Sequence, residues 1–150
     1  MPPGAFERAL EALGRKERTT SELEGWLTER GFEPAEVAGA LERLEEVGEL
    51  DDARFAHRYA EDKRELRGWG PERIREALSA RGLERTLIDE ALAGDGSDDQ
   101  LERAVALLGE RDESPDDEPS QARALAFLAR RGYDYELAYA AVRRFGDGAG

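Results

Sequence analysis

The sequence predicts an all-α protein built from three tandem three-helix repeats, each similar to a helix-turn-helix unit. Two observations support this fold class. Prolines and glycines lie where helices would begin and end, and not inside strand-like alternations of apolar and polar residues. In addition, the segment LTERGF at residues 27–32 recurs as LSARGL at 78–83 and as LARRGY at 128–133, at spacings of 51 and 50 residues. This period indicates one supersecondary unit that is used three times.

Nine helices are expected, and several of their starts carry capping signals. Thr19 and Glu22 form a capping box, in which each side chain satisfies an otherwise unpaired backbone amide at the helix start. Pro34 and Pro71 suit a first helical turn, because a proline there gives up no hydrogen bond. Further expected N-caps are Asp51 or Asp52, Ser120 and Asp134. The expected helices span 5–14, 20–30, 34–47, 52–67, 71–81, 84–93, 98–111, 120–131 and 134–145.

Glycines mark the expected helix ends. Each of the following lies after a helical pattern, where a left-handed residue would close the last turn: Gly31, Gly48, Gly68, Gly82, Gly94, Gly132 and Gly146. In the repeated segment, the leucine is expected to be the last core contact of its helix. The apolar residue after the glycine is expected to fold over the helix end, as in a Schellman cap. The arginine lies near the negative end of the helix dipole, where a cation stabilises the helix by about 0.3 to 1 kcal/mol.

The predicted units comprise residues 1–48, 49–95 and 96–150. Residues 109–121, rich in acids and serine and containing two prolines, are expected to form an exposed acidic linker within the third unit. Because units of about 50 residues are small for independent stability, neighbouring units should pack on one another or share helices.

Charge is distributed unevenly along the chain. The net charge is −13, yet residues 53–75 hold seven basic side chains against four acids, and residues 119–146 hold five arginines against two acids. Residues 20–52 and 94–118 carry eleven and ten acids respectively, each against two arginines. The overall field repels phosphate, so only a local basic patch could bind nucleic acid.

The composition and the lack of catalytic groupings exclude several classes of protein. The absence of cysteine excludes disulfides and thiolate metal sites and favours a reducing, cytoplasmic location. Neither a signal peptide nor an apolar run long enough to cross a bilayer is present. The single histidine, His57, has no second histidine or nucleophile near it, and the turn 67–71 lacks the fingerprints of a phosphate loop. A binding protein that is not an enzyme and needs no cofactor or metal is therefore expected.

The second unit contains a distinctive set of motifs. They are Leu50-Asp51-Asp52, Arg54-Phe55-Ala56, Tyr59, Gly68-Trp69-Gly70-Pro71, Arg73-Ile74, Leu78 and Arg81-Gly82. Together they resemble the central signature of the RecX family, bacterial regulators of the RecA recombinase. Similar motifs occur in the first unit, at residues 13–19, 22–23 and 30–32, and in the third, at 127–128 and 130–133, so the resemblance covers about residues 5–145.

The resemblance implies an elongated, curved molecule, which is expected to act as a monomer, and it also implies a partner. RecX-like proteins bind RecA filaments on single-stranded DNA, lodge in the helical groove, block filament growth and promote net disassembly. ATP hydrolysis, strand exchange and coprotease activity fall as a result. Single-stranded DNA would be met within the filament, because the acidic excess makes binding to free DNA weak or absent.

The candidate partner-binding residues are cations of the basic segments, the arginine of the second Arg-Gly pair and one aromatic residue. They are Arg54, Arg58, Lys63, Arg64, Arg67, Trp69, Arg73, Arg75, Arg81, Arg130, Arg131, Arg143 and Arg144. Trp69 is expected to be exposed or to anchor a partner, because it lies in a glycine-rich turn.

Two other functions remain open at this stage. The helix, Arg-Gly turn and helix of each unit could read duplex DNA, although helices 34–47, 84–93 and 134–145 contain few basic or amide side chains for that task. Alternatively, the chain could be a helical scaffold for an unrelated protein partner.

Overall fold

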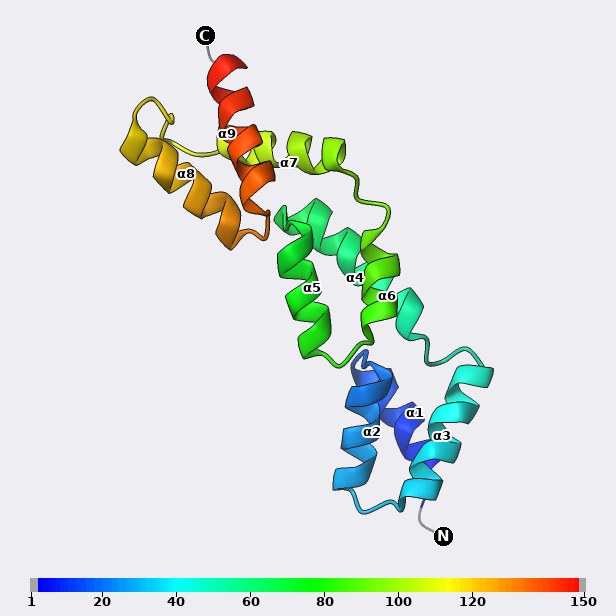
Figure 1. Cartoon of the computed structure of the whole chain (residues 1–150). Helices are drawn as coiled ribbons and strands as arrows, with labels where there is room; N and C mark the ends of the chain where they lie inside the picture. Colours follow the sequence, from blue (N-terminus) through cyan, green and yellow to red (C-terminus); the bar gives the residue numbers. More distant parts are fainter. Residues whose placement is uncertain (1–2, 149–150) are drawn as a thin grey trace.

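The computed structural model describes residues 3–148, which form nine helices arranged as an elongated row (Figure 1). The first unit contains α1 (Ala5–Arg15), α2 (Thr20–Glu29) and α3 (Pro34–Glu46). The second contains α4 (Asp52–Arg67), α5 (Pro71–Ala80) and α6 (Arg85–Leu92), and the third contains α7 (Ser97–Gly109), α8 (Glu118–Arg130) and α9 (Tyr135–Gly148). The all-α class and the order of the nine helices are confirmed for this part of the chain.

The extensive helix packing of the described residues lies within the units. The first and third helices of each unit lie against one another, as α1 with α3, α4 with α6 and α7 with α9, and the second helix packs onto the third. Each unit has its own cluster of buried apolar side chains. The helices of the three units follow one another along the row (Figure 1). Because the buried residues of each unit form a separate cluster, residues 3–148 have no single shared core.

The repeated segment ends the second helix of each unit in the predicted way. Leu27, Leu78 and Leu128 are fully buried. In the first copy, Gly31 has a φ of 87°, its amide donates to the Thr28 carbonyl at 3.0 Å, and the next amide donates to the Leu27 carbonyl at 3.4 Å. The same pair of hydrogen bonds closes the other two copies. This is a Schellman cap, and the prediction is confirmed.

Two expected left-handed glycine caps and one expected helix start are wrong. Gly94 and Gly146 lack the positive φ that was predicted for them, and Gly146 lies inside α9. Ser120 is not an N-cap, because α8 begins two residues earlier behind Asp117. Asp117 and Ser120 instead form a reciprocal capping box, with amide-to-side-chain distances of 2.9 and 3.0 Å. Local sequence did not distinguish these two caps, because Asp and Ser both serve well at this position.

The acidic linker is shorter than predicted and folds back on α8. It runs between the end of α7 at Gly109 and the start of α8 at Glu118. Glu113 accepts hydrogen bonds from Arg123 and lies 3.7 Å from the Arg111 guanidinium. The limits of the folding units at residues 48 and 95 remain a prediction, and Leu50 already packs into the first cluster.

Candidate interaction surfaces

Helix α4 carries most of the central basic segment. It begins behind Asp51, whose side chain accepts the Arg54 amide at 3.0 Å, and ends at Gly68, which has a φ of 67°. The exposed Arg54 donates to the Gly48 carbonyl at 3.0 Å, and the exposed Arg58 forms an ion pair with Glu17 of the first unit. Both side chains therefore have a partner inside the molecule.

Two further candidate arginines form internal ion pairs. Arg75 donates to Asp89 at 2.7 Å, which joins α5 to α6. Arg81 donates to both carboxylate oxygens of Glu22, at 3.1 and 2.9 Å, and so reaches from the second unit to the first. In the structure each of these arginines pairs with a carboxylate, and their expected role on a partner surface stays a prediction.

The second Arg-Gly turn forms the junction between the first two units. The buried Thr19 hydroxyl donates to the Arg81 carbonyl at 2.8 Å, while the Thr19 amide donates to Glu22 at 3.0 Å. A Cβ at Gly82 would lie 2.5 Å from the Ser21 hydroxyl oxygen, so the approach is close. Burial raises the pKa of Glu22, but hydrogen bonds from Arg81 and Thr19 outweigh it and leave that pKa below its ordinary value.

The third Arg-Gly turn forms the junction between the second and third units. The Gly70 amide donates to the Arg131 carbonyl at 2.8 Å, and the Glu72 amide donates to the Gly132 carbonyl at 3.0 Å. Gly132 has a φ of 101°, and a Cβ there would lie 2.5 Å from the Cβ of Arg73. Only glycine suits this backbone and this spacing. The repeated motif thus connects units as well as ending a helix.

A buried polar network reinforces the second junction. The side chain of Asp95 is 2% exposed and accepts two hydrogen bonds from Arg103, at 3.0 and 2.8 Å. Arg64 approaches the same carboxylate at 3.5 Å. Arg103 also donates to the Tyr133 hydroxyl, which in turn donates to the Gly68 carbonyl, both at 2.8 Å. Sequence reasoning treated Asp95 and Arg103 only as members of an acidic segment and missed this network.

The ionisation of this network follows from burial and pairing. Desolvation lowers the pKa of Arg103, but the hydrogen bonds that Arg103 donates to Asp95 and the nearby charges outweigh this effect, so the pKa of Arg103 is raised. Desolvation raises the pKa of Tyr133, and its interactions with Arg103 only partly oppose that effect. Arg103 therefore remains charged and Tyr133 neutral, which is the arrangement that the hydrogen bonds require.

The second junction brings the two basic segments together. Arg131 donates to the Arg67 carbonyl at 3.0 Å, and Arg73 donates to the Arg130 carbonyl at 3.3 Å. We define the junction cation cluster as Lys63, Arg67, Arg73, Arg130 and Arg131. No member of the cluster forms an ion pair with a carboxylate among the described residues.

Trp69 contacts two members of this cluster and is partly buried. Its ring packs against the core of the second unit. The Lys63 ammonium lies 4.9 Å from the ring centroid, and the Arg73 guanidinium carbon lies 4.2 Å from it. Trp69 therefore orients two cations through cation–π contacts. Its side chain is half-buried, so the first alternative of the prediction, an exposed Trp69, is wrong. Whether it also anchors a partner stays a prediction.

The remaining candidates lie on α9, where sequence reasoning missed two aromatic residues. Arg143 and Arg144 are exposed and have no ion-pair partner among residues 3–148. Tyr135 and Tyr139 are also exposed, and so is Leu66 on α4. The spacing of the two tyrosines by four residues could have revealed a shared helix face.

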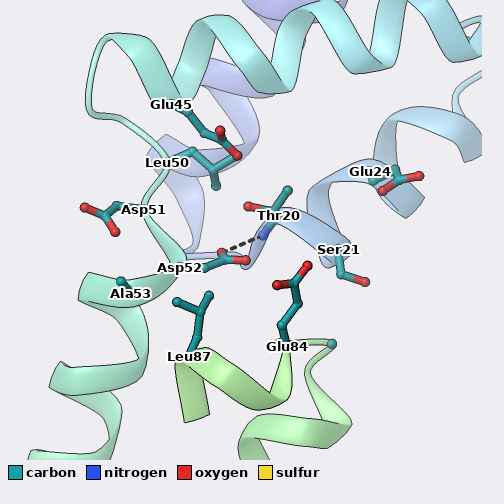
Figure 2. Close-up of a pocket in the computed structure, with 11 residues that line it drawn as sticks. Thr20, Ser21, Glu24, Glu45, Leu50, Asp51, Asp52, Ala53, Glu84 and Leu87 are labelled. Atoms are coloured by element: carbon teal, nitrogen blue, oxygen red, sulfur yellow. Dashed lines mark hydrogen bonds between the residues drawn. The ribbon is translucent and has the colours of Figure 1, made fainter. Parts of the chain in front are cut away.

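An acidic cleft of about 540 Å³ lies at the first junction (Figure 2). Five carboxylates from the first two units line it: Glu24, Glu45, Asp51, Asp52 and Glu84. Among the residues that the structure describes, Leu50 and Leu87 also line the cleft, and no lysine or arginine does. The Thr20 amide donates to Asp52 at 2.9 Å across the cleft (Figure 2). Like charge makes this surface unsuitable for phosphate, and the surfaces at the two junctions therefore differ in electrostatic sign.

Residues 3–148 contain neither a metal-binding cluster nor a membrane-spanning helix. No group of three or more histidine, aspartate or glutamate side chains there is arranged to hold a metal ion. None of the helices in this part of the chain combines the length and the apolar content that a membrane crossing requires. The single histidine, His57, is exposed on α4.

The fold and these surfaces define an all-α protein of tandem three-helix units, with polar junctions and charged faces of both signs. Two family models match it: "RecX, first three-helix domain" at residues 5–44 and "RecX, second three-helix domain" at residues 51–92. The chain belongs to the RecX family, a family of regulatory proteins.

Individual relatives agree with this assignment. The chain is 34% identical over 141 residues to the regulatory protein RecX of Mycobacterium sp. strain JLS, an alignment that covers 89% of this chain and 77% of the relative. It is 37% identical over 129 residues to the regulatory protein RecX of Chromohalobacter salexigens. This alignment covers 85% of this chain and 84% of the relative. The crystal structure of RecX from Lactobacillus salivarius has the same fold, with a TM-score of 0.85, 20% identity and 94% of each chain covered.

Proposed function

We propose that this chain restrains a RecA-type recombinase by binding its filament on single-stranded DNA and blocking filament growth, ATP hydrolysis and strand exchange. The junction cation cluster carries the proposal. It gathers five cations from two segments on a chain whose net charge is −13. Such a local patch can meet phosphate or acidic side chains, while the overall field opposes binding to bare DNA.

The shape of the molecule supports a partner with repeated subunits. Helix α4 alone has 16 residues and is therefore about 24 Å long. Three units in an elongated row reach further than one such helix, so the chain could contact more than one subunit of a filament (Figure 1). A long surface with charges of both signs fixes the register of such a complex and steers its formation. The acidic cleft would then face basic groups of the recombinase, while the cation cluster would face phosphate or acids.

The experiment that tests this function is a titration of RecA with the protein, with DNA-dependent ATP hydrolysis as the readout. The wild-type chain is expected to inhibit hydrolysis at saturating dose. A pulldown with RecA, with and without single-stranded DNA and a slowly hydrolysed ATP analogue, separates filament binding from other binding. If the wild-type protein leaves hydrolysis unchanged, the proposed function is wrong.

The structure also selects the variants for this titration. Arg64 and Arg73 donate to backbone carbonyls, so their reversal would disturb folding as well as binding. The double variant Arg67→Glu with Arg130→Glu should change binding without disturbing folding. Both side chains are exposed, and neither donates a hydrogen bond to a described residue. We expect the half-inhibitory concentration to rise on the order of tenfold or more with unchanged helicity.

The matched control for these variants is Arg85→Glu. The side chain of Arg85 is 92% exposed and lies outside the cation cluster. This variant carries the same kind of charge reversal and should inhibit RecA like the wild-type protein. Equal inhibition by the double variant and by the control would show that the cation cluster is not the contact surface.

A further inference from the structure

Helix α9 exposes two adjacent aromatic rings. Tyr135 is 70% exposed and Tyr139 is 49% exposed. Their rings are stacked, with centroids 6.2 Å apart and planes inclined by 23°. Neighbouring exposed aromatic side chains are unusual on a protein surface and typically mark a binding site.

The fold of the third unit does not need these rings. Helix α9 packs through Ala138, Ala141 and Val142, which are buried. The two tyrosines are absent from the apolar cluster that these residues form with α7 and α8. Removal of the rings should therefore leave the helix and its packing intact.

A cation continues the same face of the helix. Arg143 lies four residues beyond Tyr139 and is exposed, so it follows the two tyrosines along one strip. Arg144 is its exposed neighbour. The exposed side of α9 also carries the carboxylates Glu136 and Asp147. The local charge is thus balanced, and aromatic surface is the distinctive property of the strip.

We propose that Tyr135, Tyr139 and Arg143 form a stacking site for the bases of single-stranded DNA. This inference rests on the proposed function and names the part of the chain that would meet the DNA of the filament. The outer faces of the rings would stack on bases, which requires no particular sequence because every base has a π-face. Arg143 would contact a phosphate, and because the exposed charges of α9 are balanced, stacking would be the main source of affinity.

Photo-crosslinking in the assembled complex tests the site directly. The full chain is added to RecA filaments formed on an oligothymidylate that contains iododeoxyuridine, and to the same oligonucleotide alone at low salt. After irradiation, adducts are mapped by mass spectrometry. We expect adducts on Tyr135 or Tyr139 in the filament arm. Absence of adducts from α9 in both arms overturns the inference.

Two double variants separate stacking from simple apolar contact. Tyr135→Phe with Tyr139→Phe keeps the π-faces, whereas Tyr135→Leu with Tyr139→Leu keeps apolar surface but removes them. Binding of each variant to RecA filaments on a labelled oligothymidylate is measured by fluorescence anisotropy. The phenylalanine variant should bind with an affinity close to that of the wild-type chain. The leucine variant should bind on the order of 5- to 150-fold more weakly for each stacked base that is lost. Equal binding by the two variants would contradict a stacking site.

Three outcomes distinguish this inference from the proposed function. If the wild-type chain inhibits RecA but gives no adduct on α9, the stacking site is wrong and the proposed function stands. If the leucine variant loses inhibition without any adduct in the wild type, the strip contacts protein, and the inference is again overturned. If the wild-type chain does not inhibit RecA, the proposed function fails, and adducts with the free oligonucleotide decide the stacking site by themselves.

Discussion

Replacement of Asp95 by asparagine should destabilise the junction between the second and third units. The side chain of Asp95 is 2% exposed, and those of its two partners, Arg103 and Arg64, are each 18% exposed. Asn keeps the size and one acceptor of Asp but removes the charge that compensates two poorly solvated guanidinium groups. Removal of one partner from a buried ion pair costs about 3 to 5 kcal/mol, and we expect about 3 kcal/mol because both arginines keep some contact with water.

The assay is urea denaturation of the wild-type and variant chains followed by circular dichroism, with hydrogen exchange to locate the effect. Loss of protection should concentrate in the second and third units and spare α1–α3, because each unit packs around its own core. A loss of about 3 kcal/mol is a large share of the 5 to 15 kcal/mol that is typical of a folded protein.

A matched control breaks an exposed Arg–Asp pair by the same substitution. Asp89→Asn removes the partner of Arg75, where the two side chains are 51% and 39% exposed. Exposed pairs contribute about 0 to 1 kcal/mol, so this variant should lie close to wild type. If the two Asp→Asn variants agreed within about 0.5 kcal/mol, burial of the Asp95 network would not be the source of its stability, and the reasoning would be refuted.

Two further predictions concern the connecting turns. Gly31→Ala and Gly132→Ala both place a Cβ at positive φ, which costs about 1 to 2 kcal/mol of stability. Only Gly132→Ala also brings that Cβ within 2.5 Å of Arg73. In urea denaturation, Gly132→Ala should therefore lower the free energy of unfolding by at least about 1 kcal/mol more than Gly31→Ala. Equal losses would show that the junction adjusts freely. Because the pKa of Glu22 is lowered in the folded state by the bonds from Arg81, its contribution is present above its ordinary pKa of 4.5 and is lost as the pH falls below that value. Denaturation of the wild type and of Glu22→Gln should therefore differ at pH 7 and converge in acid, and a constant difference would contradict this assignment.

The helices could be predicted because their signals are local. The capping box of Thr19 and Glu22 and the prolines at the first turns of α3 and α5 appear as expected. The three Arg-Gly segments end helices through hydrogen bonds within six residues of one another. Such contacts depend on residues that are adjacent in the chain, so the sequence alone is sufficient to identify them.

The candidate site could be predicted only in part. The sequence identified the basic segments, but their charge count did not reveal which cations are engaged inside the molecule. Arg81 pairs with Glu22, 59 residues away, while Arg73 reaches the carbonyl of Arg130, 57 residues away. These contacts depend on how one unit packs on the next, and local periodicity carries no information about that geometry.

The amino-acid sequence by itself determined the all-α class, the order of the nine helices of the described chain and the Arg-Gly turns that end α2, α5 and α8. The tertiary structure alone decided that two of those turns connect neighbouring units, that Asp95 is buried between arginines, and that two separate basic segments form one cluster. The physical reason is the range of the interactions. Capping and amphipathic patterns act over a few residues, whereas close backbone approach and ion pairing across a junction exist only after whole units have packed together.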